Sequence, residues 1–202
     1  MRRVLFFSSV FLAFLCVLVV SSLAFFPWEQ AGEYGMGILS KSLAQRGFPL
    51  SFDRVQARRQ FLPDFVVTNV VLGNMLGGIR VRELVLTPRA LQSAVNLGAS
   101  AELSFRDAEI TFGKDGRAAI SGGTVWFLLG RKSARIDVIE TRGDIKVRGR
   151  IVVDPPNRRI SGANVELGVA DALDAKLGAL KGILPLDREK KGLWRWKQGE
   201  VS

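Results

Sequence analysis

An uninterrupted apolar segment near the N-terminus, Val4–Phe26, governs how this chain can fold. Its 23 residues include no charged residue, no proline and no glycine. A helix of that length reaches roughly 34 Å, enough for the hydrocarbon core of a bilayer. A buried helix of a soluble protein would carry a polar stripe, whereas this segment has only four scattered serines and Cys16. The sequence therefore predicts a transmembrane helix.

The charges that flank the segment predict its orientation. Arg2 and Arg3 precede it, whereas Glu29 follows it and the next basic residue is Lys41. The positive-inside rule then leaves the N-terminus in the cytoplasm and the rest of the chain on the opposite side. Trp28 stands where an aromatic residue would anchor a helix at the membrane interface. Val4, Phe26 and Trp28 are therefore the predicted anchor residues.

The alternative to an anchor is a cleaved signal peptide. Ser22-Leu23-Ala24 has the small-x-small pattern of a cleavage site. The apolar stretch is longer than that of a typical signal peptide, however, and Phe25-Phe26 continues it past the candidate cleavage site. Leu15 before Cys16 is also too large for a lipoprotein signal. We favour an uncleaved anchor.

The rest of the chain divides into a helix and a β-rich domain. Residues 29–46 have the period of an amphipathic helix that Gly47 ends, and Pro27 either ends the apolar segment or opens this helix. We expect this helix to lie close to the membrane and to connect the anchor to the domain. Three regions follow: 1–26 as cytoplasmic tip and anchor, 27–47 as membrane-proximal helix, and 48–202 as a β-rich domain.

From Phe48 onward the apolar residues recur with a period of two, which is typical of half-buried antiparallel strands. Ile145 and Ile151 fall on one face of such a strand, whereas Arg148 and Arg150 fall on the other. The alternation breaks near Glu83 and Asp107. A turn at residues 154–157, Asp-Pro-Pro-Asn, predicts that 145–153 pairs with 160–169.

The predicted fold class is mainly β, with an N-terminal transmembrane helix followed by an open, mostly antiparallel sheet. Several strands carry polar residues along one entire face, which favours one open sheet over a sandwich. Two short helices, Pro88–Leu97 and Asp171–Leu184, interrupt the sheet, in addition to the helix at 29–46. Leu193–Lys197 alternates again and is predicted to be the last strand.

No catalytic motif is recognisable in the sequence. The chain has no histidine and one cysteine, which excludes Ser-His-Asp and Cys-His nucleophile systems and His-containing zinc sites. Asp107 and Asp154 lie in predicted turns or loops, where Asp is a common residue. Ser121-Gly122-Gly123-Thr124 lacks the lysine of a phosphate-binding loop. We therefore predict no enzyme, no catalytic residue, no metal and no cofactor.

The region after the anchor is basic. Residues 27–202 contain 27 Lys and Arg against 19 Asp and Glu, with the two signs interspersed. This excess suits anionic lipid headgroups or an acidic partner, and equally a solvated basic surface. Nucleic acid is not expected as a partner for a domain outside the cytoplasm.

The C-terminal strand contains the candidate binding residues. Trp194 and Trp196 share one face at strand spacing, and Arg195 and Lys197 flank them. The tryptophans either close the end of the hydrophobic core or form an aromatic contact surface, where neighbouring cations would suit a protein interface. We take Trp194, Trp196, Arg195 and Lys197 as the predicted partner-binding set.

Several of these features resemble one known family. The basic tip, the apolar segment ending in Phe26-Pro27-Trp28-Glu29, the helix up to Gly47 and the run Leu50-Ser51-Phe52-Asp53-Arg54-Val55 are similar to the N protein of bacterial type II secretion systems, in particular its delta-proteobacterial form. The segment 84–91, where a strand leads into a helix, and the hairpin 144–162 extend the resemblance over most of the chain.

The resemblance implies a single-pass protein of the bacterial inner membrane with a periplasmic β domain like that of AsmA-like envelope proteins. In those proteins the sheet is curved and its inner face is apolar. The implied function is a non-enzymatic assembly or scaffolding component that contacts other secretion-system or envelope proteins. The alternative is an envelope lipid-binding or lipid-transfer protein that holds acyl chains against the inner face.

Overall fold

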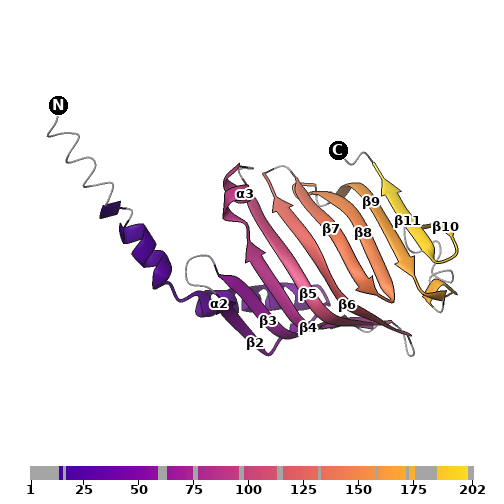
Figure 1. Ribbon diagram of the computed structural model, residues 1–202, viewed down its shortest axis with the longest axis horizontal. Helices are drawn as coiled ribbons and strands as arrows, with labels where there is room; N and C mark the ends of the chain where they lie inside the picture. Colours follow the sequence, from indigo (N-terminus) through magenta and orange to yellow (C-terminus); the bar gives the residue numbers. More distant parts are fainter. Residues whose placement is uncertain are drawn as a thin grey trace.

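The protein is an open β-sheet with a helical segment at one end, seen in a computed structural model (Figure 1). α2, Trp28–Ala44, passes behind the first strands of the sheet in this view. The last strands lie at the opposite end of the sheet. The structure describes residues 14–15, 17–58, 63–74, 77–95, 98–112, 116–131, 133–157, 159–171, 173–175 and 186–199.

After α2 the described elements follow in chain order. They are β1 Leu50–Ser51, β2 Arg54–Arg58, β3 Asp64–Asn74, β4 Gly77–Pro88, α3 Ala90–Val95, β5 Ala99–Phe112, β6 Gly116–Leu129, β7 Ala134–Gly143, β8 Ile145–Asp154, β9 Arg159–Val169, β10 Asp187–Lys190 and β11 Leu193–Gln198.

The described strands form one antiparallel sheet of 11 strands. Their order is β1-β3-β4-β5-β6-β7-β8-β9-β11-β10, and β2 also pairs with β3. From β3 to β9 each strand pairs with the next in the sequence. At the C-terminal end this order changes, because β11 lies between β9 and β10. The predicted mainly β fold with an open antiparallel sheet is confirmed.

Strand register separates the sheet into an apolar face and a polar face. One row of paired residues on the apolar face crosses eight strands, and it consists of Phe65, Leu86, Leu103, Val125, Val138, Gly149, Val165 and Trp196. A row on the polar face contains Thr87, Glu102, Trp126, Asp137, Arg150, Asn164 and Lys197. Side chains of successive strand residues point to opposite sides, so the two rows face away from each other.

The alternation of apolar-face and polar-face residues along each strand is interrupted in several of the first strands. The interruptions lie side by side and form a line across the sheet. Asn69 in β3 and Asp107 in β5 both have φ 50°, in the left-handed region that Asn and Asp tolerate. The buried residues on either side of Asn69, Val67 and Val70, are therefore three positions apart. The line ends at Gly143, where φ is 133° and a Cβ would lie 2.4 Å from the Ala119 carbonyl oxygen. This is the irregularity that the sequence indicates near Glu83 and Asp107.

The largest part of the core lies between α2 and the first strands. Val55, Val67, Val70, Val81, Ala108 and Ile120 are buried there. Met36 of α2 packs against this group. Gly32 lets the helix approach the sheet closely, because a Cβ at this position would lie 2.9 Å from side-chain atoms of Phe65 and Val55. The connecting helix is therefore part of the folded domain.

Two predicted helices differ from the structure. Pro88 is the last residue of β4, and α3 begins at Ala90. Proline is tolerated there because the pairing of β4 with β3 ends at Leu86, so no donor is needed on that side. The predicted helix at 171–184 is described only at residues 171 and 173–175, which are helical. β10 is absent from the sequence prediction.

The hairpin prediction for the last large pair of strands is confirmed. β8 and β9 pair from Ile145↔Val169 to Asp154↔Arg159. Asn157 closes the turn between them, since both its backbone N–H and its side-chain amide donate to the Asp154 carboxylate, at 3.2 and 2.7 Å. The same bonds hold the pKa of Asp154 below its ordinary value, together with the charge of Arg159 and against the effect of burial.

Candidate functional site

The predicted C-terminal set is divided between the two faces of the sheet. Trp194 pairs with Leu167 and Trp196 with Val165, all on the apolar face. Arg195 and Lys197 point to the polar face, opposite Glu166 and Asn164. The tryptophans share a face, as predicted, but the cations that flank them in sequence do not lie beside them. The four residues therefore do not form one surface.

Trp194 is part of the hydrophobic core. It is 1% exposed, and its indole Nε1–H donates to Asp174 Oδ1 at 2.7 Å. The Arg188 guanidinium lies 5.9 Å from the centre of the indole ring and also donates to Asp174. Trp194 is therefore buried in this structure and presents no surface to a partner.

Asp174 holds this end of the sheet together. Burial by itself raises the pKa of the Asp174 carboxyl, but hydrogen bonds from the Trp194 indole and the Gly192 backbone N–H outweigh it. The charge of Arg188 acts in the same direction, so the pKa lies below its ordinary value. These hydrogen-bond donors explain why the carboxylate can be buried, and its role is structural.

Arg195 is paired with acids of the sheet through its terminal nitrogens, whereas Lys197 is exposed. Arg195 forms ion pairs with Glu166 of β9 and Glu189 of β10, the latter at 2.5 Å. β10 pairs with β11 as far as Arg195, so β11 is not an edge strand over its first half. The outer edge of Trp196–Gln198 has no partner strand among the described residues.

Two of the three predicted anchor residues are described. The Phe26 ring lies at a tilt against Trp28 with ring centroids 4.5 Å apart, and Trp28 Nε1–H donates to the Leu23 carbonyl at 3.0 Å. Trp28 also meets Phe65 of β3 edge to face at 6.4 Å. Trp28 therefore links the end of the apolar segment to the sheet.

Val4 lies outside the described residues, as does most of the first half of the predicted span. Residues 14–15 and 17–24 are helical. Their apolar side chains are exposed around the helix, with Val17 at 63% and Leu18 at 51%. Across the described ranges, no helix is both long and apolar enough to cross a membrane.

The residues that sequence reasoning missed lie in the middle of the polar face. Trp126 of β6 is 44% exposed and Ile139 of β7 is 43% exposed. They line the same shallow hollow, together with Arg148 and Arg150 of β8. The alternation Val125, Trp126, Phe127 could have placed Trp126 on the polar face from sequence. Its neighbours come from other strands and carry no local signal.

The acids do not form a reactive group in the described part of the chain. No cluster of three or more His, Cys, Asp or Glu that could hold a metal occurs there. The remaining shifted group is Lys191, whose pKa is raised by a hydrogen bond to Asp171 at 2.8 Å. Each shifted pKa is thus explained by a local hydrogen bond or ion pair, and none by a pair of acids sharing a cleft.

One family matches almost the whole chain. The family described as "Type II secretion system protein GspN-like, Synergistales" matches residues 3–198, which include both the apolar segment and the complete described sheet. The chain therefore belongs to this family of GspN-like secretion-system proteins. The match is to the Synergistales form, while the sequence resemblance is drawn to the delta-proteobacterial one. No curated protein and no solved structure matches the chain.

Proposed function

We propose that this protein is a non-enzymatic component of a type II secretion system, anchored in the inner membrane, whose periplasmic sheet acts in assembly of the complex. The observation that carries the proposal is the family match over residues 3–198. It is supported by the architecture, since a broad open sheet exposes long rows of side chains and strand edges to which other proteins can bind. No catalytic residues need to be invoked.

Membrane anchoring by 4–26 is the first part of the proposal. It is supported by the exposed apolar side chains of residues 17–20, which a bilayer would cover. Tyr34 and Ile38 of α2 are also exposed apolar groups, and they suit the membrane interface. The sheet would then be held close to the bilayer through Trp28.

The topology has a direct test. A reporter that is active only in the periplasm, fused after Ser202, should be active, and the mature protein should begin at or near Met1. A soluble protein whose N-terminus is Phe25 would instead establish cleavage of a signal peptide.

Assembly with other proteins is the second part. The outer edge of Trp196–Gln198, where β10 ends, offers unpaired backbone groups to a strand of another chain. A crosslinker at Lys197 in whole cells tests this edge, because Lys197 is exposed. Crosslinks to another protein of the secretion system are expected. Crosslinks to lipid alone would argue against assembly.

Lipid binding is the second candidate function, and the apolar face favours it. The core under α2 is closed, but farther along the sheet Phe127, Ile136 and Ile151 are half-exposed and Leu129 is 53% exposed. Acyl chains could cover this part of the face, as in AsmA-like envelope proteins. Mass spectrometry of lipids that co-purify with the full-length protein separates the two functions. Bound lipid at a stoichiometric level would favour lipid transfer, and the absence of bound lipid would favour scaffolding.

A further inference from the structure

Two exposed apolar side chains lie close together on the polar face of the sheet. Trp126 and Ile139 are the two large apolar side chains most exposed on this face within the described residues. Trp126 occupies a row whose other members are polar, between Glu102 of β5 and Asp137 of β7. A tryptophan on the core side of the sheet would be ordinary, but here the core lies on the opposite face.

A register irregularity brings Ile139 to the same place. The pairing of β6 with β7 shifts between Thr124 and Val125, which leaves Ile139 as the extra residue of β7. Such a bulge re-aims the side chain of the inserted residue. Ile139 then borders two hollows, one shared with Trp126 and the other with Arg106 and Arg142. The bulge joins them into one surface.

The charges around this surface are unbalanced. Five arginines and two acids line the two hollows. Asp137 is shared by Arg135 and Arg150, at 2.7 and 2.6 Å, and Glu140 pairs with Arg142 at 3.5 Å. The acids are thus already occupied by arginines of the same surface, and positive charge remains.

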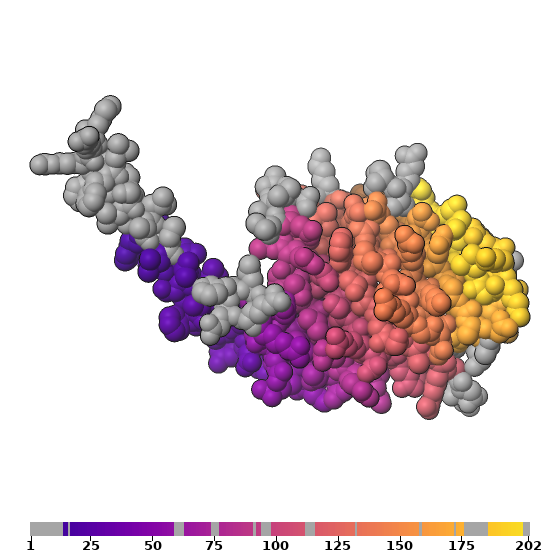
Figure 2. Space-filling view, in the orientation of Figure 1, coloured from indigo at the N-terminus to yellow at the C-terminus, as the bar shows by residue number. Residues whose placement is uncertain are grey.

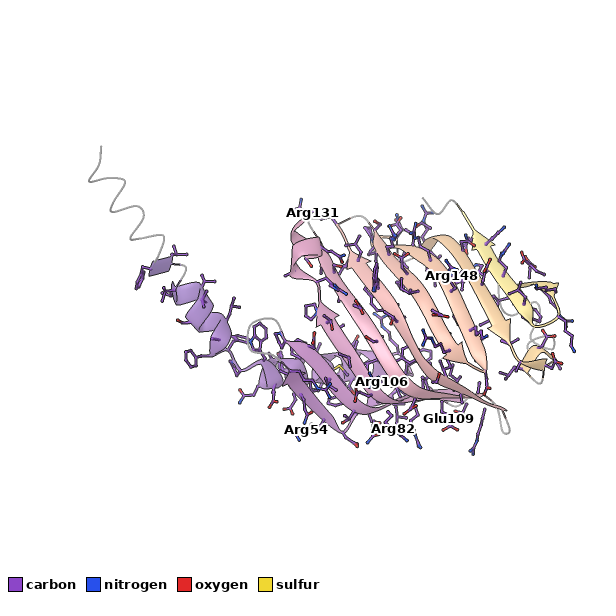
Figure 3. All side chains as sticks on the ribbon, viewed as in Figure 1. Arg54, Arg82, Arg106, Glu109, Arg131 and Arg148 are labelled. Carbon is purple, nitrogen blue, oxygen red and sulfur yellow. The ribbon has the colours of Figure 1, made fainter. Side chains whose placement is uncertain are left out.

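Within the described part of the chain, Arg148 has no ion pair, and the acid opposite it is paired with another arginine. Arg148 of β8 lies opposite Glu166 of β9, which in turn lies opposite Arg195 of β11. Glu166 pairs with Arg195. Arg148 forms no ion pair among the described residues, and it is exposed on the sheet (Figure 3). Arg106 likewise lies opposite Glu83 without an ion pair between them.

This combination has the composition of the centre of a protein interface. Tryptophan and arginine dominate the residues that contribute most to binding, and they cluster inside a polar rim. The residues sit on four consecutive strands, β5 to β8, so their arrangement is fixed before a partner arrives. Figure 2 shows these strands forming one continuous face of the molecule.

We propose that Trp126, Ile139, Arg106 and Arg148 form the docking site for another protein of the secretion complex, which presents carboxylates around an apolar side chain. The proposal rests on the proposed assembly function and names the surface that performs it. Lys197 ends the same row of the polar face as Trp126. It lies about 19 Å away, four strand spacings, and so falls within the rim of one ordinary interface.

Site-specific crosslinking in whole cells tests the docking site in the full-length protein. A photoactivatable phenylalanine analogue replaces Trp126, and the matched control replaces Leu129, which is exposed on the opposite face of the same strand. The analogue at 126 should crosslink to a segment of another secretion-system protein that contains Asp or Glu, and the analogue at 129 should not. A crosslink at 126 to lipid, or to a second copy of this chain, would overturn the proposal.

Charge reversal measures the contribution of Arg148. Arg148→Glu should reduce recovery of the crosslinked partner about tenfold or more, as loss of an interface hot spot does. Arg131→Glu, the same charge change in the exposed loop after β6, should change recovery less than about twofold. A Glu→Arg change in the crosslinked segment of the partner should restore binding to Arg148→Glu.

The outcomes distinguish this docking site from the assembly function itself. Equal co-purification of secretion-system proteins with Arg148→Glu, Trp126→Ala and wild-type protein, none of which carries the crosslinker, would refute the docking site and leave assembly intact. Recovery of no secretion-system protein with wild-type chain would refute the assembly function. Each variant should have the same thermal unfolding temperature as the wild-type protein. This control shows that a loss of binding is not caused by a loss of fold.

Discussion

Trp194 and Trp126 lie on strands with the same apolar–polar alternation, but their surroundings are opposite. Trp194 points to the apolar face, where Asp174 and Arg188 enclose it. Trp126 points to the polar face, where no described side chain covers it and 44% of it is exposed. A tryptophan in a strand is thus a core residue or a contact residue according to what the other elements place above it. The following predictions test this difference.

The largest expected effect is that of removing the buried indole. Trp194→Ala should lower the free energy of unfolding by about 3–5 kcal/mol, because it creates a cavity and removes one of the hydrogen-bond donors to the buried Asp174 carboxylate. Trp126→Ala should cost less than about 1 kcal/mol, since water already contacts that ring. Chemical denaturation of the full-length protein in detergent, followed by circular dichroism, measures both. Similar losses for the two variants would contradict the assignment of Trp126 to a free surface.

The carboxylate that anchors Trp194 should make stability depend on pH. The pKa of Asp174 is lowered in the folded protein, so its charged form stabilises the fold above its ordinary pKa. That contribution is lost as pH falls through the lowered pKa, below the ordinary value of 3.8. Asp174→Asn should therefore lower the unfolding midpoint at neutral pH and reduce its decline in acid. Asp171→Asn, which removes an exposed carboxylate, is the matched control.

The third comparison is between Arg150 and Arg148, which both lie on the polar face. Arg150→Asp should cost about 1 kcal/mol, because it breaks a half-buried ion pair and places a second carboxylate beside Asp137. Arg148→Asp should change stability by less than about 0.5 kcal/mol, since Arg148 has no ion pair to lose. Equal losses in a denaturation experiment would mean that Arg148 is also engaged and that the free charge at the docking site is overestimated.

Sequence reasoning predicts the local part of this structure well. The face of each residue in β8 and the turn closed by Asn157 depend on alternation and turn chemistry, which act over a few residues. The sequence predicts only an irregularity at Asp107. Its left-handed backbone depends on neighbouring strands, and so does the placing of β11 between β9 and β10.

The candidate sites were harder to predict, because each depends on distant residues. Trp194 and Trp196 have the same sequence context, and what separates them is Asp174, 20 residues away from Trp194. Arg148 lies opposite Glu166, which pairs instead with Arg195 on another strand. Periodicity assigns such residues to a face of the sheet but does not give their partners.

The smallest expected effect tests how far the docking site extends. Lys197 lies at the end of the row that contains Trp126, so a partner centred on Trp126 would meet it at the rim. Rim charges affect the rate of association and its salt dependence more than the affinity. Lys197→Glu should therefore weaken recovery of the partner by about two- to threefold at low salt and by less at high salt. A loss as large as that of Arg148→Glu would move the centre of the interface to the C-terminal strand, and no change at either salt would confine it to β5–β8.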